Sequence, residues 1–444
     1  MSHFIPNTDK DREEMLRSIG VSSFKELLKD IPEEAFFKGK LNLPGPLSEL
    51  EVEDEIKKFA EENQADLKIF AGGGIYDHFI PAVVDQILLR SEFYTSYTPY
   101  QAEVSQGTLQ TMFEYQSMIC ELTAMEVANA SMYDGASAIA EAALMALRIR
   151  HDRDKILVAS NLNPFYKEVL KTYLHGQNTP LEFVKMGSDG ALDLEDLKEK
   201  LDSNVAGFIF QHPNFFGVLE DPFEISKIVK NHDAILIASV NPISLGILEP
   251  PGAYGADIVV GEGQPLGLPM SFGGPLLGIF ASKMEYIRSM PGRISGMTED
   301  VEGKRGFVMT LQTREQHIRR ERATSNICSN QQLCATAAAI YMSLLGKEGI
   351  KEVAQQSLFK AHYLKELLED AVKFPYSGPF FNEFVIELPH SARKIIDDML
   401  KYNILAGIDL AQFGFPENFL LVSVTEKRRK EEIEEYATIL KEVI

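Results

Sequence analysis

Between residues 155 and 282, short runs of apolar, strand-favouring residues alternate with segments of helical spacing. The runs are KILVAS (155–160), LEFVKM (181–186), VAGFIFQ (205–211), AILIASV (234–240), ADIVVG (256–261) and LLGIFAS (276–282). Strands that are apolar on both faces and separated by helices are typical of a mostly parallel sheet in an α/β domain. Ligands of such sheets bind in the loops beyond the carboxyl ends of the strands.

The pattern predicts three parts of the chain. Residues 1–65 read as an N-terminal helical arm of short acidic helices, with Ser48 as a candidate helix cap. Residues 66–330 form the expected large α/β domain. Residues 331–444 open with an Ala-rich helix, continue with two short strands and further helices, and predict a small α+β domain.

Composition excludes several classes of function. The net charge of −21 argues against nucleic-acid binding, which requires a basic surface. Three cysteines without a CxxC pair suit a reducing cytoplasm and argue against a structural zinc site. Because neither a signal peptide nor an apolar run of ~18 residues is visible, we expect a cytoplasmic protein that binds no membrane.

The loop VVGEGQPLGLPMSFGGP (259–275) is the candidate floor of a site, because an apolar run ends there in glycines and prolines. Gln264 stands at its centre, where a nucleophile is expected. The G-x-G-x-x-x-G spacing is one residue off the dinucleotide fingerprint and leads into Pro269 instead of a helix. These features argue against a nicotinamide cofactor.

The segment SMYDGASAIAEAALMALRIR (131–150) is a Gly-Ala-Ser turn that leads into a helix. Free N–H groups at such a start suit a phosphate. Asp134 equally suits a helix cap, and its charge would repel a phosphate. We favour the capping role.

The segment 93–116 is rich in Tyr and Gln, and Tyr94, Tyr97 and Tyr100 recur at every third residue. Pro99 favours an extended backbone in the first half of this segment. Tyrosines are common at interfaces because they bury area and keep a polar tip. We therefore favour an interface over ordinary core packing.

The segment 313–326 concentrates charge in a way that is typical of a solvated or ion-paired helix face. Its density of basic side chains in an acidic chain also supports a contact with an anion or a partner. The charged residues are Arg314, Glu315, His317, Arg319, Arg320, Glu321 and Arg322.

The segment AGGGIYDHFIPAVV (71–84) places Asp77 and His78 after three glycines. A metal site built on this pair is disfavoured, because adjacent side chains seldom converge on one ion and no further ligand cluster accompanies them.

Several of these motifs together resemble the glycine cleavage system P-protein (glycine decarboxylase) family. They are GGGIYDHFIP, YTPYQAEVSQGTLQ, ANASMYDGASA, PNFFGVLED, GEGQPLGLPMSFGGP and TREQHIRRERATSNICSNQ. The resemblance covers nearly the whole chain. The length of the chain is similar to that of subunit 1 (the alpha subunit) in organisms whose P-protein is divided into two subunits. It implies a fold like aspartate aminotransferase, type I among the pyridoxal-phosphate (PLP) enzymes.

The family decarboxylates glycine, with PLP as the electron sink, and transfers the aminomethyl group to the lipoyl arm of the H-protein. In the homologous subunit 2, the PLP lysine lies in a segment like HKTFxIPHGGGGPG, and that lysine falls on Gln264 when the two loops are laid together. A Schiff base needs a primary amine, which Gln lacks. The resemblance therefore implies no catalytic residue in this chain and no covalent cofactor, with PLP bound by the partner subunit. Asn241 lies near where type I enzymes place an Asp beside the pyridine nitrogen.

Because type I enzymes build their sites at dimer interfaces, we expect a heterotetramer with two copies of each subunit. The expected interface or site-proximal residues are Tyr94, Tyr97, Tyr100, Gln101, Arg314, His317, Arg319 and Arg320. Two alternatives remain open: a self-sufficient PLP enzyme that uses Lys185 or Lys283, and a regulatory or scaffold protein of the same fold.

Overall fold

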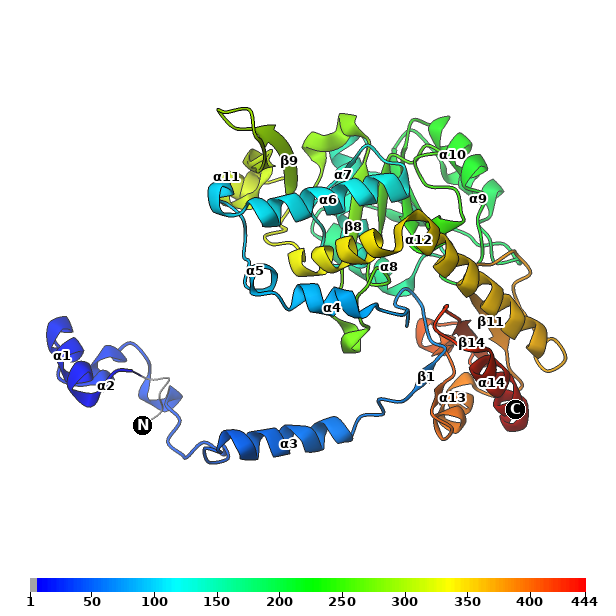
Figure 1. Cartoon of the computed structure of the whole chain (residues 1–444). Helices are drawn as coiled ribbons and strands as arrows, with labels where there is room; N and C mark the ends of the chain where they lie inside the picture. Colours follow the sequence, from blue (N-terminus) through cyan, green and yellow to red (C-terminus); the bar gives the residue numbers. More distant parts are fainter. Residues whose placement is uncertain (1–5) are drawn as a thin grey trace. The chain divides into compact units, whose positions relative to one another are not determined.

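A seven-stranded sheet organises the chain after residue 65 (Figure 1). The computed structural model describes residues 6–444. The strand order is β2-β8-β7-β6-β5-β3-β4; β8 is antiparallel to both of its neighbours, and the remaining pairs are parallel. The strands are β2 (Val127–Ala128), β3 (Lys155–Ala159), β4 (Leu181–Val184), β5 (Val205–His212), β6 (Ile235–Val240), β7 (Ile258–Glu262) and β8 (Gly278–Ser282). The mostly parallel α/β sheet predicted from the apolar runs is confirmed.

Helices cover both faces of this sheet, because alternate side chains of each strand point to opposite sides. Ile156 of β3 packs in the core under α7 and α8, whereas Leu157 packs in the core under the other helices. The helices on the first face are α7 (Gly135–Ile149) and α8 (Pro164–His175). Those on the second face are α6 (Gln106–Thr123), α9 (Leu194–Lys200), α10 (Pro222–Lys230) and the first part of α12 (Gln332–Leu368).

A second core forms around a three-stranded antiparallel sheet of order β11-β14-β13. The short strand β1 pairs in parallel with β12, and Phe70, which follows β1, packs in this second core. The elements are β1 (Lys68–Ile69), β11 (Glu383–Glu387), α13 (Ala392–Leu400), β12 (Ile404–Leu405), β13 (Ile408–Asp409), β14 (Phe419–Ser423) and α14 (Lys430–Val443).

The long helix α12 passes through both cores. Residues Cys334 to Ala354 pack against the large sheet, and Ala361 to Leu368 pack in the second core. Within the first of these stretches the helix is kinked at Gly346, whose φ of 58° and ψ of −171° no side chain adopts without strain. One helix therefore joins the two packed bodies.

The segment Met1–Gln64 is a separate unit from Ala65–Ile444. Its main helices are α1 (Asp9–Ile19) and α3 (Glu49–Glu61), and the predicted cap Ser48 is confirmed, since its hydroxyl accepts the Glu51 N–H. No side chain among residues 6–64 is buried. The short helix α2 (Phe24–Leu27) lies between them.

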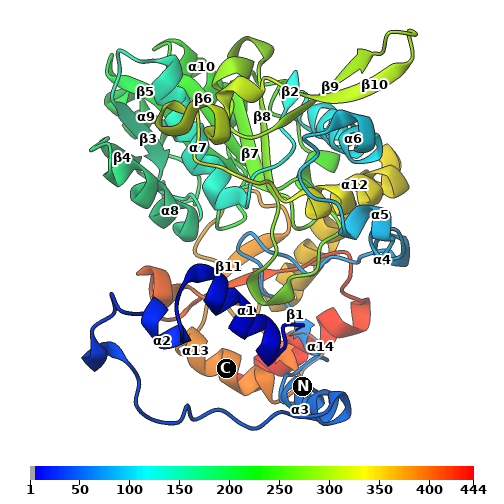
Figure 2. The ribbon, with the colours of Figure 1, turned by 90° about the vertical axis from the view of Figure 1, so that its left-hand side faces the viewer.

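Smaller elements complete the second unit. In Figure 2 the antiparallel hairpin of β9 (Ile294–Glu299) and β10 (Arg305–Thr310) projects from the rest of this unit. The short helices α4 (Ala82–Leu88) and α5 (Ser91–Tyr94) precede α6. Within residues 6–444, no helix is both long and apolar enough to cross a membrane.

Candidate functional site

Loops from three parts of the chain meet where β6 and β7 end. Asn241 follows β6 directly, Glu262 is the last residue of β7, and Gln264 lies two residues beyond it. Asp134 comes just before α7, in a segment that pairs with the start of β8 beside β7. Parallel strands place their carboxyl ends at one edge, which is where α/β sheets bind ligands. We call these four residues the sheet-end site.

The Gln264 side chain is buried, with 1% of its surface exposed. Its Oε1 accepts the Tyr76 N–H at 2.9 Å, and its Nε2 donates to the carbonyls of Tyr76 (3.1 Å) and Leu268 (2.7 Å). Both ends of the amide are therefore occupied by backbone groups. The Gln264 side chain therefore joins two loops through their backbone groups.

Glu262 is buried beside it and accepts three backbone hydrogen bonds. Its Oε1 accepts the N–H groups of Gln264 and Leu277, both at 3.0 Å, and its Oε2 accepts the Gly135 N–H at 2.9 Å. Burial raises the pKa of Glu262 to about 7, although the three donors favour the ionised form. The carboxyl thus lies at the start of α7.

Asp134 caps α7, as predicted. Its Oδ1 accepts the Ser137 N–H at 2.6 Å, and the Ser137 hydroxyl completes a capping box. With Glu262 on Gly135 and Asp134 on Ser137, two of the first N–H groups of the helix are already satisfied within the chain.

These residues do not fit PLP. Gln264, where the sequence resemblance leads us to expect the lysine of a PLP-bearing homologue, offers only an amide, and the helix start that would receive a phosphate holds carboxylates. The adjacent cavity, lined by Tyr76, Tyr166, Asn241 and Glu262 among others, measures about 20 Å³, which is room for about one water molecule and not for a pyridine ring. The Asn241 Oδ1 accepts the Ile243 N–H at 3.0 Å, while its buried Nδ2 has no partner among the described residues.

Neither alternative lysine lies at this site. Lys185 follows β4, which is an outermost strand of the sheet, and its side chain is exposed beside Asp196. Because β4 lies three strands from β6, the two strands are about 14 Å apart. Lys283 follows β8. Because β8 is antiparallel to β7, Lys283 lies beside the amino end of β7, away from the sheet-end site, and pairs with Asp257 there.

The glycine-rich segment before α4 joins the sheet-end site to the second core. The Tyr76 hydroxyl donates to Glu383 Oε2 at 2.5 Å, and the Gly73 N–H donates to Glu383 Oε1 at 2.6 Å. Burial raises the pKa of Glu383 to about 7. Its carboxyl therefore connects this segment to β11.

Asp77 and His78 turn to different partners. Asp77 pairs with Lys427 (2.6 Å) and Arg428 (2.8 Å), and His78 Nδ1 lies 2.5 Å from Glu426. In the part of the chain that the structure describes, no group of three His, Cys, Asp or Glu side chains is placed to hold a metal.

A second region gathers the predicted tyrosines. Tyr94 ends helix α5, which the sequence pattern read as extended, and its side chain is exposed, as is that of Tyr97 at 83%. The Tyr100 ring lies 5.2 Å from the His317 ring, edge to face. We call the segment Tyr94–Gln101, which is exposed except at Thr98 and Pro99, together with His317 the tyrosine face.

The buried Arg293 contacts the tyrosine face through Tyr100. Arg293 was not identified as a site residue from the sequence. It is 5% exposed, donates to the Tyr100 hydroxyl (3.3 Å) and the Cys328 carbonyl (2.7 Å), and pairs with Glu315 at 3.6 Å. Glu315 in turn lies 3.5 Å from His317, so that these side chains form a closed ring. A lone arginine between glycine and isoleucine gives no sequence signal of such burial.

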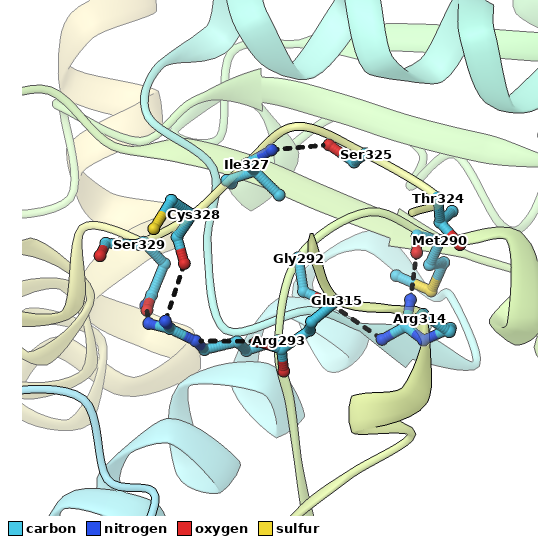
Figure 3. A pocket seen from close by; sticks show the side chains of 11 residues that line it. Met290, Gly292, Arg293, Arg314, Glu315, Thr324, Ser325, Ile327, Cys328 and Ser329 are labelled. Atoms are coloured by element: carbon cyan, nitrogen blue, oxygen red, sulfur yellow. Dashed lines mark hydrogen bonds and ion pairs between the residues drawn. The ribbon is translucent and has the colours of Figure 1, made fainter. Parts of the chain in front are cut away.

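Figure 3 shows the segment Thr324–Ser329 beside Arg293 and Arg314 in a small pocket. Arg314 is buried and donates to the carbonyls of Met290, Gly292 and Leu311. It holds backbone in place, whereas the side chains of Arg319 and Arg320 are exposed.

The charged helix suggested by segment 313–326 does not form. The chain makes three single turns instead: η6 (Gln312–Arg314), α11 (Gln316–Arg319) and η7 (Arg320–Arg322). Arg320 has a φ of 55° and a ψ of −123°, which breaks the helix and which only glycine adopts freely.

Comparisons with known proteins agree with this geometry. A family model described as glycine cleavage system P-protein matches residues 2–440. A Chloroherpeton thalassium relative named "Probable glycine dehydrogenase (decarboxylating) subunit 1" is 53% identical over 444 residues and covers 99% of both chains. A Carboxydothermus hydrogenoformans relative of the same name is 52% identical over 442 residues, covering 98% of this chain and 99% of its own.

A crystal structure of glycine decarboxylase (P-protein) of the glycine cleavage system, in inhibitor-bound form, superimposes with a TM-score of 0.91 at 42% identity and covers 100% of both chains. A Lactobacillus brevis glutamate decarboxylase matches with a TM-score of 0.69 at 12% identity, covering 92% of this chain and 95% of its own, and shares the fold alone. The expected type I PLP-enzyme fold is confirmed. The chain belongs to the glycine cleavage system P-protein family.

Proposed function

We propose that this chain is the subunit of a two-subunit glycine decarboxylase that does not anchor PLP. The complex decarboxylates glycine and passes the aminomethyl group to the lipoyl arm of the H-protein. The observation that carries this proposal is Gln264, because its buried amide is fully engaged by backbone groups and supplies no amine. PLP, when bound, supplies the electron sink from the partner subunit.

The partner is a homologous, PLP-bearing subunit 2, in an assembly with two copies of each chain. The relatives' name, subunit 1, supports a second subunit. The tyrosine face supports an interface, since its aromatic side chains stay exposed here while Arg293 contacts Tyr100 and Glu315 contacts His317. This chain's contribution is then to position groups around the partner's cofactor and exclude water. Three free cysteines suit a cytoplasmic complex.

The test mixes this chain with the PLP-bearing subunit and follows exchange of bicarbonate with the glycine carboxyl group. We expect activity from the mixture and none from this chain alone. Borohydride reduction followed by peptide mapping should then place the pyridoxyl-lysine on peptides of the partner.

Two outcomes would contradict the proposal. A stoichiometric pyridoxyl-lysine on Lys185, Lys283 or another lysine of this chain would make it a self-sufficient PLP enzyme. No gain in exchange on mixing would favour a regulatory or scaffold protein of the same fold.

A further inference from the structure

Glu262 has no part in the proposed chemistry, yet its carboxyl connects three separate segments. The donors are Gly135 at the start of α7, Gln264 after β7 and Leu277 just before β8. All three are backbone N–H groups between 2.9 and 3.0 Å from an oxygen. The side chain is buried, so that water does not compete for these donors.

The place that this carboxyl occupies is one that attracts anions. The helix α7 is 15 residues long, and its first N–H groups carry the partial positive charge of the helix dipole. A free phosphate or the phosphate of a cofactor binds at such a start through the same N–H groups. Here an oxygen of the chain itself accepts the Gly135 N–H.

The surroundings leave no space for a second anion. A Cβ built on Gly135 would lie 2.5 Å from the Tyr166 hydroxyl and 3.0 Å from the Glu262 N, so that even a methyl group meets atoms there. The cavity beside it measures about 20 Å³. Tyr166 and Glu262 therefore fill the volume in front of the helix.

We propose that Glu262 is a built-in carboxylate ligand that replaces a bound anion at the start of α7, so that this subunit folds without PLP or phosphate. The inference rests on the proposed function in one respect, which is that PLP belongs to the partner. It adds that removal of the Glu262 carboxyl opens an anion site in a chain that otherwise has none there.

The experiment measures thermal unfolding of the full-length chain in sodium phosphate and in sodium chloride of equal ionic strength. We expect the wild type to unfold at the same temperature in both. Glu262→Ala should unfold at a lower temperature in chloride, and phosphate at ten times its dissociation constant should raise that temperature by roughly 1.5 °C.

Glu220→Ala is the matched control. The Glu220 carboxyl is also buried and also accepts three hydrogen bonds, from Asn161, Asn214 and Leu192, but none comes from the first turn of a helix. This variant should lose stability without recovery in phosphate. Equal recovery in both variants, no recovery in Glu262→Ala, or a wild type that phosphate stabilises would each overturn the inference.

If Glu262→Ala does not fold, the wild type still decides. Hydrogen–deuterium exchange of the peptide that contains Gly135 should be slow without any added anion and unchanged by phosphate or PLP. Fast exchange that either compound slows would show an open helix start. Failure of the glycine exchange assay with the partner would contradict the proposed function and leave these results unaffected.

Discussion

The sheet-end site and the tyrosine face differ in how their polar groups are satisfied. In the first, the side chains of Gln264 and Glu262 are buried and bonded to backbone groups of this chain. In the second, Tyr97 and His317 remain exposed, and the buried Arg293 donates a hydrogen bond to the Tyr100 hydroxyl. The Gln264 and Glu262 side chains use their donors and acceptors on this chain's own backbone, which leaves these two side chains no capacity for a ligand. A region that holds aromatic side chains in place at the surface has contacts left to make, and we expect it to act in the assembly.

Gln264→Lys is the strongest way to break this comparison. The ammonium would be buried and two loops would lose the amide that joins them, so that the free energy of unfolding should fall by about 4 kcal/mol. Gln101→Lys makes the same change on the tyrosine face and should alter the isolated chain by about 0.5 kcal/mol or less. Urea denaturation of both variants checks this. A stable Gln264→Lys chain that forms a pyridoxyl-lysine would show that the site still accepts PLP.

The pH dependence of stability sharpens the account of the buried carboxyls. Because burial raises the pKa of Glu383 from 4.5 to about 7, the folded chain binds this proton more tightly than the unfolded chain. The protonated Glu383 carboxyl therefore stabilises the folded chain fully below about pH 4.5. This stabilisation is lost as the pH rises through 7, by about 3 kcal/mol in total.

Glu383→Gln removes this titration and keeps both contacts, since the amide can accept from Gly73 and donate to the Tyr76 hydroxyl. Relative to the variant, the wild type should lose about 3 kcal/mol between pH 4.5 and pH 7. Denaturation curves of both proteins across this range give the difference. A difference that does not change with pH would mean that Glu383 has an ordinary pKa.

Arg293→Lys tests whether the contacts of the buried Arg293 beneath the tyrosine face stabilise the chain. A lysine cannot reach Tyr100, Cys328 and Glu315 at once, so that the free energy of unfolding should fall by about 2 kcal/mol. The exposed Arg393, which pairs with Asp397 on the surface, is the control, and Arg393→Lys should have no measurable effect. Equal effects of the two substitutions would mean that the ring around Arg293 adds no stability.

Tyr97→Ala addresses the surface itself and should have the smallest effect on the isolated chain, within about 0.5 kcal/mol. Its affinity for the PLP-bearing subunit should fall about tenfold, or about 1.4 kcal/mol. Tyr402→Ala, at an exposed position between α13 and β12, should leave that affinity unchanged. Sedimentation measurements of both mixtures compare them, and identical dissociation constants would remove Tyr97 from the interface.

The large sheet was predictable because burial of a strand on both faces leaves a local signal, a continuous apolar run such as VAGFIFQ at 205–211. The Asp134 cap was predictable because its partner, Ser137, is three residues away. The contact of Glu262 with Gly135 spans 127 residues and that of Tyr76 with Glu383 spans 307. No local pattern encodes such contacts.

The tyrosine face shows the same limit. The exposed tyrosines could be named from their spacing, but the arginine beneath them could not, because its burial depends on how residue 293 and residue 328 meet in space. Segment 313–326 was misread as one helix, since its charge pattern carries no trace of the left-handed backbone at Arg320.

The kinked helix α12 has a consequence for how the chain folds. Residues Cys334 to Ala354, on both sides of the kink at Gly346, pack in the core of the large sheet, and Ala361 to Leu368 pack in the second core. Loss of either core would leave one part of the helix without its packing partners, and the remaining core alone would have to stabilise the helix. The two bodies are therefore coupled in folding, and a destabilising substitution in one of them weakens the other as well.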